Sequence, residues 1–285
     1  MNTPFSTKSA VGVASEQVEP ADILRGLYGD GMIACKGAFS RDWVAQLGED
    51  IAILFDEARA QPGGALERGP ARFYVEIHPQ RLRGFLDIIN HPWFRAVCAN
   101  VLGPDYKVVE VGFDIPGPGA MHQPWHRDFP APPATLLERR LDSLAFNITT
   151  VDVTEEMGPL EIAPGTQWDT LEGDDPMFPS KASWPRYEAR RQARTPQMGD
   201  ISARSALTIH RGTANRSNRA RPVLVLGVDA PGAANAARHD LQLTRAYAAS
   251  LDPQVLRHLD CRLVDTLEPI VQEHTIAGLL MGMAG

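Results

Sequence analysis

The residues best suited to chemistry in this sequence are a histidine and an aspartate two positions apart, His126 and Asp128, and a second histidine, His210. In an extended segment, residues i and i+2 project from the same face, so the imidazole of His126 and the carboxylate of Asp128 can bind one ion. A lone His-x-Asp pair is more often solvated or hydrogen-bonded locally. Two histidines and one carboxylate on different strands, however, form the ligand set of non-haem Fe(II) oxygenases, which leaves coordination positions open. The pattern therefore predicts a metal site.

Arg221 lies across a polar turn from His210. An apolar strand from Gly199-Asp200 ends at His210, residues 211–218 form the turn, and a second strand returns from Arg221. A hairpin of this shape brings His210 and Arg221 to one end of a barrel. Arginine binds a carboxylate bidentately and keeps its charge when buried. The molecule 2-oxoglutarate offers a 2-oxo acid for a metal and a distal carboxylate for such a cation. The alternative is an arginine that only opens a strand at the surface.

The elements that must position these residues change character along the chain. Residues 21–104 show helical spacing around one short strand at 32–35, with Ser40 as a helix N-cap. From Tyr106 the apolar period changes to two, and Gly-Pro turns separate the segments. The expected strands are 106–115, 121–128, 142–152, 159–163, 200–209 and 221–229. This order predicts a mainly β fold with flanking helices around a double-stranded β-helix, a cupin-like jelly roll.

The same order predicts the domain organisation. A loose N-terminal segment, 1–20, precedes a single domain, 21–285. Its expected parts are a helical buttress at 21–104, a β-barrel core at 105–230 and C-terminal helices at 233–285. An insertion at 168–198 interrupts the core and is too long for an idle loop. Its basic cluster is either a solvated helix face or part of a lid that meets an anionic substrate. The cluster consists of Arg186, Arg190, Arg191 and Arg194.

Composition argues against several classes of protein. The chain has 285 residues, 44% of them hydrophobic, which is ample for a core. Its formal net charge of -7 argues against a nucleic-acid-binding surface. No apolar run reaches the ~18 residues of a membrane helix. Three cysteines without CxxC spacing are typical of reduced thiols in a cytoplasmic protein. We expect a small-molecule substrate, no nucleic-acid or membrane partner, and a chain whose sequence is compatible with a homo-oligomer.

Three motifs together resemble the phytanoyl-CoA dioxygenase family of Fe(II)/2-oxoglutarate-dependent oxygenases. The family patterns are P-G-x-x-x-Q-x-x-H-x-D, N-G-x-L-x-x-x-P-G-[ST]-H and H-x-[GS]-x-x-N-x-[ST]-x-x-x-R. They correspond here to Pro118–Asp128, Met157–Gln167 and His210–Arg221. Each motif alone is modest, but the three agree in order and spacing over about residues 20 to 230.

The resemblance implies a fold, a ligand set and a cosubstrate site. The implied Fe(II) ligands are His126, Asp128 and His210. The implied 2-oxoglutarate-binding residues are Arg221, Gln123, Asn147 and Thr213. Dioxygen is the second cosubstrate.

The sequence also departs from the family patterns. Met157 replaces the usual Asn and Gln167 the usual His, both at positions expected in turns or at the rim of the site. Many relatives carry a hydroxyl one position before Thr213, where this chain has Gly212.

The implied activity is that of a dioxygenase that hydroxylates a small organic molecule and releases succinate and CO2. Its substrate would be a secondary metabolite, an amino acid derivative or an acyl compound. Two alternatives stay open. The same iron site serves desaturation, epoxidation or rearrangement, and a cupin-like barrel can bind a small molecule without 2-oxoglutarate turnover. Halogenation is disfavoured because Asp128 fills the position that halide takes in halogenating relatives.

Overall fold

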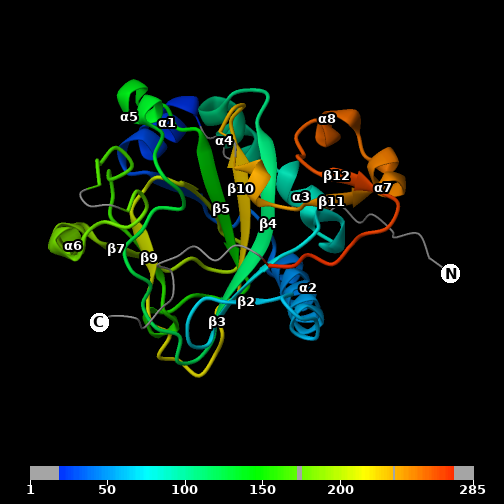
Figure 1. Cartoon of the computed structure of the whole chain (residues 1–285), viewed down its shortest axis with the longest axis horizontal. Coiled ribbons are helices and arrows are strands. Elements are labelled where there is room, and N and C mark those ends of the chain that lie inside the picture. The colour runs from blue at the N-terminus through cyan, green and yellow to red at the C-terminus, as the bar shows by residue number, and fades with distance from the viewer. Residues whose placement is uncertain (1–18, 172–174, 234, 273–285) are drawn as a thin grey trace.

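A seven-stranded antiparallel sheet is the centre of the computed structural model, which describes residues 19–171, 175–233 and 235–272 (Figure 1). Its strand order is β1-β8-β5-β10-β4-β3-β2. The strands are β1 (Met32–Cys35), β2 (Leu66–Glu67), β3 (Arg72–Glu76), β4 (Lys107–Pro116), β5 (Ser143–Thr149), β8 (Ile201–Ser205) and β10 (Val223–Asp229). A smaller antiparallel sheet has the order β7-β6-β9, with β6 (Leu160–Ile162), β7 (Gln192–Arg194) and β9 (His210–Gly212). Residues of both sheets line one cavity, so the expected jelly roll is confirmed.

Helices cover the outer face of the large sheet (Figure 1). They are α1 (Pro20–Gly29), α2 (Arg41–Arg59), α3 (Phe85–Ile89) and α4 (Pro92–Leu102). The Ser40 hydroxyl caps α2 as expected, because it accepts a hydrogen bond from the backbone N–H of Trp43. Phe94 of α4 packs against Phe146 of β5, with ring centroids 4.4 Å apart. The apolar core therefore lies behind the sheet, and the inner face of the sheet is left for the cavity.

The remaining elements are short. They are η1 (Pro79–Arg81), α5 (Pro133–Glu138), η2 (Glu155–Met157), η3 (Lys181–Ser183), α6 (Trp184–Arg190), η4 (Ala236–Arg238), β11 (Gln242–Thr244), α7 (Arg245–Ser250), α8 (Pro253–Leu256) and β12 (Arg262–Val264). The insertion at 168–198 is partly helical through η3 and α6. Its last element, β7, joins the smaller sheet.

Three local expectations are corrected. Residues 121–128 form no strand, since only His126 makes a β-bridge; Pro124 lacks the N–H that a ladder needs. The stretch 21–104 contains more than the one expected strand at 32–35, because β2 and β3 also join the large sheet. The stretch from 233 is not purely helical either, because β11 and β12 pair in parallel. Residues 1–18 of the expected loose segment and residues 273–285 of the expected C-terminal helices lie outside the described residues.

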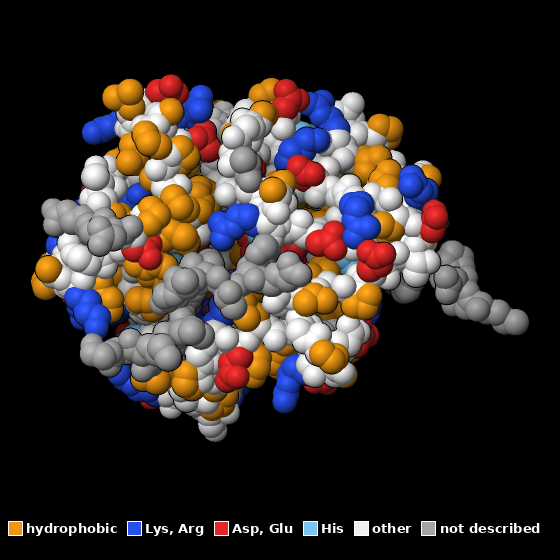
Figure 2. Space-filling view, in the orientation of Figure 1, with side chains coloured by type: hydrophobic (Ala, Val, Ile, Leu, Met, Phe, Trp, Pro, Cys, Tyr) orange, Lys and Arg blue, Asp and Glu red, His pale blue; other side chains and the backbone are white. Residues whose placement is uncertain are grey.

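The surface carries charges of both signs. Figure 2 shows small groups of basic and acidic side chains interspersed over the described part of this face. The three cysteines, Cys35, Cys98 and Cys261, form no disulfide with one another. Within the described residues, the longest apolar helices fall short of what crossing a membrane requires.

Candidate metal centre and cosubstrate pocket

The two histidines are held by a reciprocal backbone bridge between segments distant in sequence. The N–H of His126 donates to the carbonyl of His210 at 3.0 Å, and the N–H of His210 donates back at 2.9 Å. Each ring nitrogen Nδ1 lies 2.9 Å from the carbonyl two residues earlier, at Pro124 and Thr208. These contacts place the proton on Nδ1 and leave both Nε2 atoms available as ligands.

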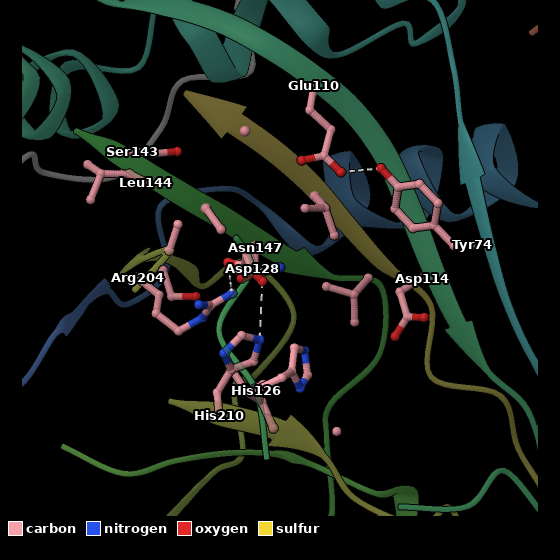
Figure 3. Close-up of a pocket in the computed structure, with 18 of the residues that line it drawn as sticks. Tyr74, Glu110, Asp114, His126, Asp128, Ser143, Leu144, Asn147, Arg204 and His210 are labelled. Atoms are coloured by element: carbon pink, nitrogen blue, oxygen red, sulfur yellow. Dashed lines mark hydrogen bonds and ion pairs between the residues drawn. The ribbon is translucent and has the colours of Figure 1, made fainter. Parts of the chain in front are cut away.

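Asp128 completes the cluster. Its backbone N–H donates to the carbonyl of Ala206 at 2.9 Å, and its Oδ1 lies 3.4 Å from Nε2 of His210. The ligand atoms of His126, Asp128 and His210 all lie within 4.8 Å of one another (Figure 3). The structure thus brings the three sequence-predicted residues together, although the segment that carries two of them is an irregular loop and not a strand.

The electrostatics suit a divalent cation. Burial lowers the pKa of His126 well below its usual value, and His210 lowers it further. Burial also lowers the pKa of His210, with a smaller effect from Arg204. For Asp128, burial raises the pKa, but Arg204 and His210 outweigh it and hold the pKa well below its usual range. At neutral pH the cluster therefore holds two neutral imidazoles and one carboxylate, the protonation states that metal binding requires.

Arg204 is a residue of this centre that the motif reading missed. Its side chain projects from β8, is 6% exposed, and donates from Nη2 to Oδ2 of Asp128 at 2.9 Å. Nη1 donates to the carbonyl of Ser205 at 3.1 Å. One carboxylate oxygen of Asp128 is thereby fixed while the other faces His210. The signal in the sequence was a single charged residue inside the apolar run 201–209.

The cavity beside the cluster contains three of the four predicted cosubstrate residues: Arg221, Gln123 and Asn147. Arg221 is 5% exposed, and its Nε has no hydrogen-bond partner among the described residues. Burial, and to a smaller extent Arg72, lowers the pKa of Arg221 to about 10. The buried Oδ1 of Asn147 is likewise unpartnered within the described part of the chain. Unpartnered buried polar atoms around a cavity are the expected mark of a polar ligand site.

Gln123 and Thr213 make structural contacts. The side-chain oxygen of Gln123 accepts a hydrogen bond from the backbone N–H of Gly212 at 2.8 Å. The backbone N–H of Gln123 donates to the carbonyl of Gly212, also at 2.8 Å. The Thr213 hydroxyl donates to the carbonyl of Pro159 at 2.7 Å. Thr213 is not among the residues that line the cavity.

Gln167, expected at a turn or rim, is fully buried at the end of α1. Its side-chain NH2 donates to the carbonyls of Leu27, Tyr28 and Gly29 at 3.2, 2.9 and 3.1 Å. These are orphan carbonyls of a helix C-terminus, so Gln167 caps α1. Met157 is also buried. Neither residue lines the cavity, so both departures from the family pattern concern the interior of the fold.

A second arginine, Arg72, was missed as well because residues 21–104 were expected to be helical. It lies on β3, is fully buried, and lines the cavity. Arg72 pairs across the sheet with Pro116, whose carbonyl accepts the backbone N–H of Arg221 at 3.1 Å. Two buried arginines, Arg72 and Arg221, therefore lie next to the end of β4 and line the same cavity.

The insertion is tied to neighbours of the metal-ligand candidates. Arg127, between His126 and Asp128, donates from its backbone to Met177 at 3.0 Å and from Nη2 to the carbonyl of Asp169 at 2.8 Å. Arg211, directly after His210, donates to Glu188 of α6 at 2.7 Å.

The basic cluster of the insertion is engaged within the fold. Arg186 pairs with Asp169, Arg190 with the carbonyl of Pro164, and Arg191 with Glu188 and Glu161. Of the four arginines only Arg194 lines the cavity.

A jelly-roll cavity that gathers two histidines and one aspartate beside buried arginines defines the class of non-haem Fe(II)/2-oxoglutarate-dependent oxygenases. The family model of phytanoyl-CoA dioxygenase (PhyH) matches residues 27–223, more than half of the chain. The chain belongs to this family, and the resemblance carried by the motifs is confirmed. The family's cofactor is Fe(II), and its cosubstrates are 2-oxoglutarate and dioxygen.

Solved structures support the fold. AviO1 from Streptomyces viridochromogenes Tue57 is similar with a TM-score of 0.57 and 18% identity, over 76% of this chain and 98% of that one. The epimerase SnoN, solved with Fe3+, alpha-ketoglutarate and nogalamycin RO, is similar with a TM-score of 0.55 and 20% identity, over 74% and 85% of the chains. A comparison with curated protein sequences gave no match.

Proposed function

We propose that this protein is an Fe(II)/2-oxoglutarate-dependent dioxygenase that hydroxylates a small organic molecule and releases succinate and CO2. The observation that carries the proposal is the grouping of three ligand atoms within 4.8 Å on the wall of a cavity. The same cavity contains buried arginine nitrogens that have no hydrogen-bond partner among the described residues. The donor chemistry suits Fe(II) and the arginines suit a carboxylate.

The residues divide the work between metal and cosubstrate. His126, Asp128 and His210 would hold Fe(II), which would supply the redox chemistry by which dioxygen oxidises both 2-oxoglutarate, to succinate and CO2, and a substrate C–H bond. Arg204 keeps Asp128 ionised and oriented. Arg221 would pair with the distal carboxylate of 2-oxoglutarate. Asn147 lines the same cavity.

The strand register shows which cavity residues lie at the end away from the arginines. Ala145 of β5 pairs with both Arg204 and Gly227, and Gly227 pairs with Glu110, so these residues form one row across the sheet. The row with Asp114 lies four residues along β4, toward the arginines. In Figure 3, Glu110 and Ser143 lie along the strands on one side of the metal-ligand cluster, while Asp114 lies near the other end of β4. We assign the substrate to the end with Glu110 and Ser143.

Two measurements test the proposal. First, anaerobic addition of Fe(II) and then 2-oxoglutarate should produce a visible metal-to-ligand charge-transfer band, and the band should be absent in Asp128→Ala. Second, succinate release should be stimulated by a true substrate from a library of fatty acyl-CoAs, amino acids and secondary metabolites. A band without succinate from any compound would favour the small-molecule-binding barrel. Product analysis then separates hydroxylation from desaturation, epoxidation or rearrangement.

A further inference from the structure

The end of the cavity under β3 holds a buried cation, Arg72, that has no hydrogen-bond partner within the part of the chain that the structure describes. Arg72 is fully buried, and its Nε, Nη1 and Nη2 make no hydrogen bond to any described residue. Its nearest carboxylate oxygen is Oδ2 of Asp114, 3.7 Å from Nη2, and the buried Oδ1 of Asp114 is also unpartnered. A guanidinium group removed from water in this way is costly unless a ligand supplies the missing contacts.

The charges at this end do not balance. Arg72 and Arg221 are both buried, and Asp114 is the carboxylate that faces them. Each of the two arginines has its pKa lowered by burial, and in Arg221 the proximity of Arg72 lowers it further. Arg68 adds a half-exposed guanidinium, whose central carbon lies 3.9 Å from the ring centroid of Tyr74. The two buried arginines and one aspartate leave one positive charge in excess, which one carboxylate of a ligand would neutralise.

Gly212 makes room for the Arg72 side chain. A Cβ atom at Gly212 would lie 2.3 Å from Nη2 and 2.4 Å from Nη1 of Arg72. The backbone of Gly212 cannot move away easily, because Gln123 holds its N–H and its carbonyl through two hydrogen bonds of 2.8 Å. Gly212 has no positive φ, so the space next to Arg72, and not backbone conformation, accounts for glycine here.

We propose that Arg72 is a second cosubstrate-binding residue, which together with Arg221 binds the distal carboxylate of 2-oxoglutarate, and that Gly212 lacks a side chain so that the guanidinium of Arg72 can reach the cavity. The inference rests on the proposed function and deepens it. A carboxylate has two oxygens, each of which can accept more than one hydrogen bond, so one carboxylate can form charge-assisted hydrogen bonds to both guanidinium groups at once. The site therefore selects 2-oxo acids that carry a second, distal carboxylate.

The test is a titration of 2-oxoglutarate against the anaerobic charge-transfer band in Arg72→Gln and the wild type. Losing one partner of a buried charge pair costs roughly 2–5 kcal/mol, which corresponds to an affinity loss of about 30-fold or more. Fe(II) affinity measured without 2-oxoglutarate should be unchanged. Arg68→Gln is the matched control, because it removes the same charge from a half-exposed neighbour, and its affinity loss should be several-fold smaller.

A selectivity ratio separates ligand binding from a structural role. The wild type should prefer 2-oxoglutarate over 2-oxopentanoate, which lacks the distal carboxylate, and Arg72→Gln should lose most of that preference. A structural defect would weaken the binding of both compounds by the same factor. That result would overturn the proposal.

The contact with Gly212 gives a second, independent set of variants. Gly212→Ser should weaken 2-oxoglutarate binding in the wild type, but it should add little in an Arg72→Ala background, because the clash disappears with the arginine. Additive losses would contradict the proposed arrangement. If the Arg72 variants fail to fold, Gly212→Ser alone keeps the test open, because it retains Arg72 and should still raise the 2-oxoglutarate midpoint; an unchanged midpoint would overturn the proposal.

The proposal and the proposed function fail in different ways. If the wild type binds Fe(II) and shows no band with 2-oxoglutarate, the proposed function is wrong. If the wild type shows the band and Arg72→Gln matches its midpoint and its selectivity, only the role of Arg72 is wrong.

Discussion

At the scale of single residues, the metal centre depends on side chains whose neighbours fix their orientation. His126 and His210 each have Nδ1 engaged by a backbone carbonyl, and Asp128 has Oδ2 engaged by Arg204. Such outer contacts select the tautomer of a ligand and its direction. Removing a ligand and removing a residue that orients a ligand should therefore have different effects.

Removing a ligand should abolish metal binding. His126→Ala leaves one histidine and one carboxylate, which hold a divalent metal poorly, so stoichiometric Fe(II) binding should be lost. His122→Ala is the control, because His122 lies four positions earlier, is exposed, and does not line the cavity. Metal content after anaerobic loading and desalting measures both variants. Equal metal content in the two proteins would refute the ligand assignment.

Removing the outer contact should weaken the metal without abolishing it. Arg204→Met keeps a long side chain but leaves Oδ2 of Asp128 without its donor, and loss of an outer-shell partner typically reduces metal affinity by about 10- to 100-fold. Arg204→Lys should recover part of the loss, since the charge returns without the planar fork. Competition titration with a chelator measures the affinity. An unchanged value in Arg204→Met would mean that the backbone alone fixes Asp128.

The arginine that the motif itself indicates is tested in the same way. Arg221→Ala should raise the 2-oxoglutarate midpoint of the anaerobic band by tens- to thousands-fold, from the roughly 2–5 kcal/mol that an orphaned buried charge costs. The midpoint of Arg221→Lys should lie between those of the wild type and Arg221→Ala. Fe(II) affinity should be the same in all three proteins. Equal midpoints in all three proteins would make Arg221 an ordinary strand residue.

At the scale of elements, the sequence predicted what local patterns determine. Ser40, the helix it caps and the period-two segment from Tyr106 follow from rules that act within a few residues, and the structure contains them. Motif spacing likewise singled out His126, Asp128 and His210, whose ligand atoms lie within 4.8 Å of one another in the structure. The strand expected over 121–128 was wrong, since Pro124 has no N–H to donate to a ladder and only His126 makes a β-bridge, to His210.

Tertiary partners explain what the sequence did not predict. β3 is stable as a strand because β4 lies beside it, and this neighbour brings Arg72 to the cavity. Gln167 caps α1, which lies 138 to 140 residues earlier in the chain. Neither contact leaves a periodic signal in the sequence.

One strand separates stability from binding. In β5, Phe146 faces α4 and is fully buried in the core, whereas Asn147 lines the cavity. Phe146→Ala should lower the free energy of unfolding by about 3–5 kcal/mol, because it leaves a cavity behind the sheet. Asn147→Ala should change that free energy much less and should weaken 2-oxoglutarate binding. Urea denaturation and the anaerobic titration measure the two effects. If both variants changed the free energy of unfolding and the 2-oxoglutarate affinity to the same extent, the two faces of β5 would not have separate roles.

At the scale of the whole molecule, described residues of the insertion contact the neighbours of the metal-ligand candidates. Trp125 precedes His126, is fully buried, and donates from Nε1 to Glu188 of α6 at 3.1 Å. Arg211 follows His210, lies over the Trp125 ring at 4.4 Å, and donates from Nη1 and Nη2 to Glu188 at 2.7 and 3.2 Å. A shift of either loop on metal binding therefore has a direct route to α6.

This coupling predicts that ligands protect the insertion from proteolysis. Fixing His126, Asp128 and His210 on a metal orders the loops that carry Trp125 and Arg211, so cleavage within 175–198 should slow when Fe(II) and 2-oxoglutarate are bound and slow further with substrate.

Glu188→Gln should weaken the link, because it keeps an acceptor for Trp125 but removes the charge that Arg211 meets. Cleavage of Glu188→Gln should be faster than in the wild type, and ligands should protect it less. Arg190→Gln is the control on the same helix, since Arg190 contacts the carbonyl of Pro164 and neither loop. Timed digestion followed by mass spectrometry locates the cuts. Equal protection in Glu188→Gln and Arg190→Gln would show that α6 packs on the barrel independently of the metal centre.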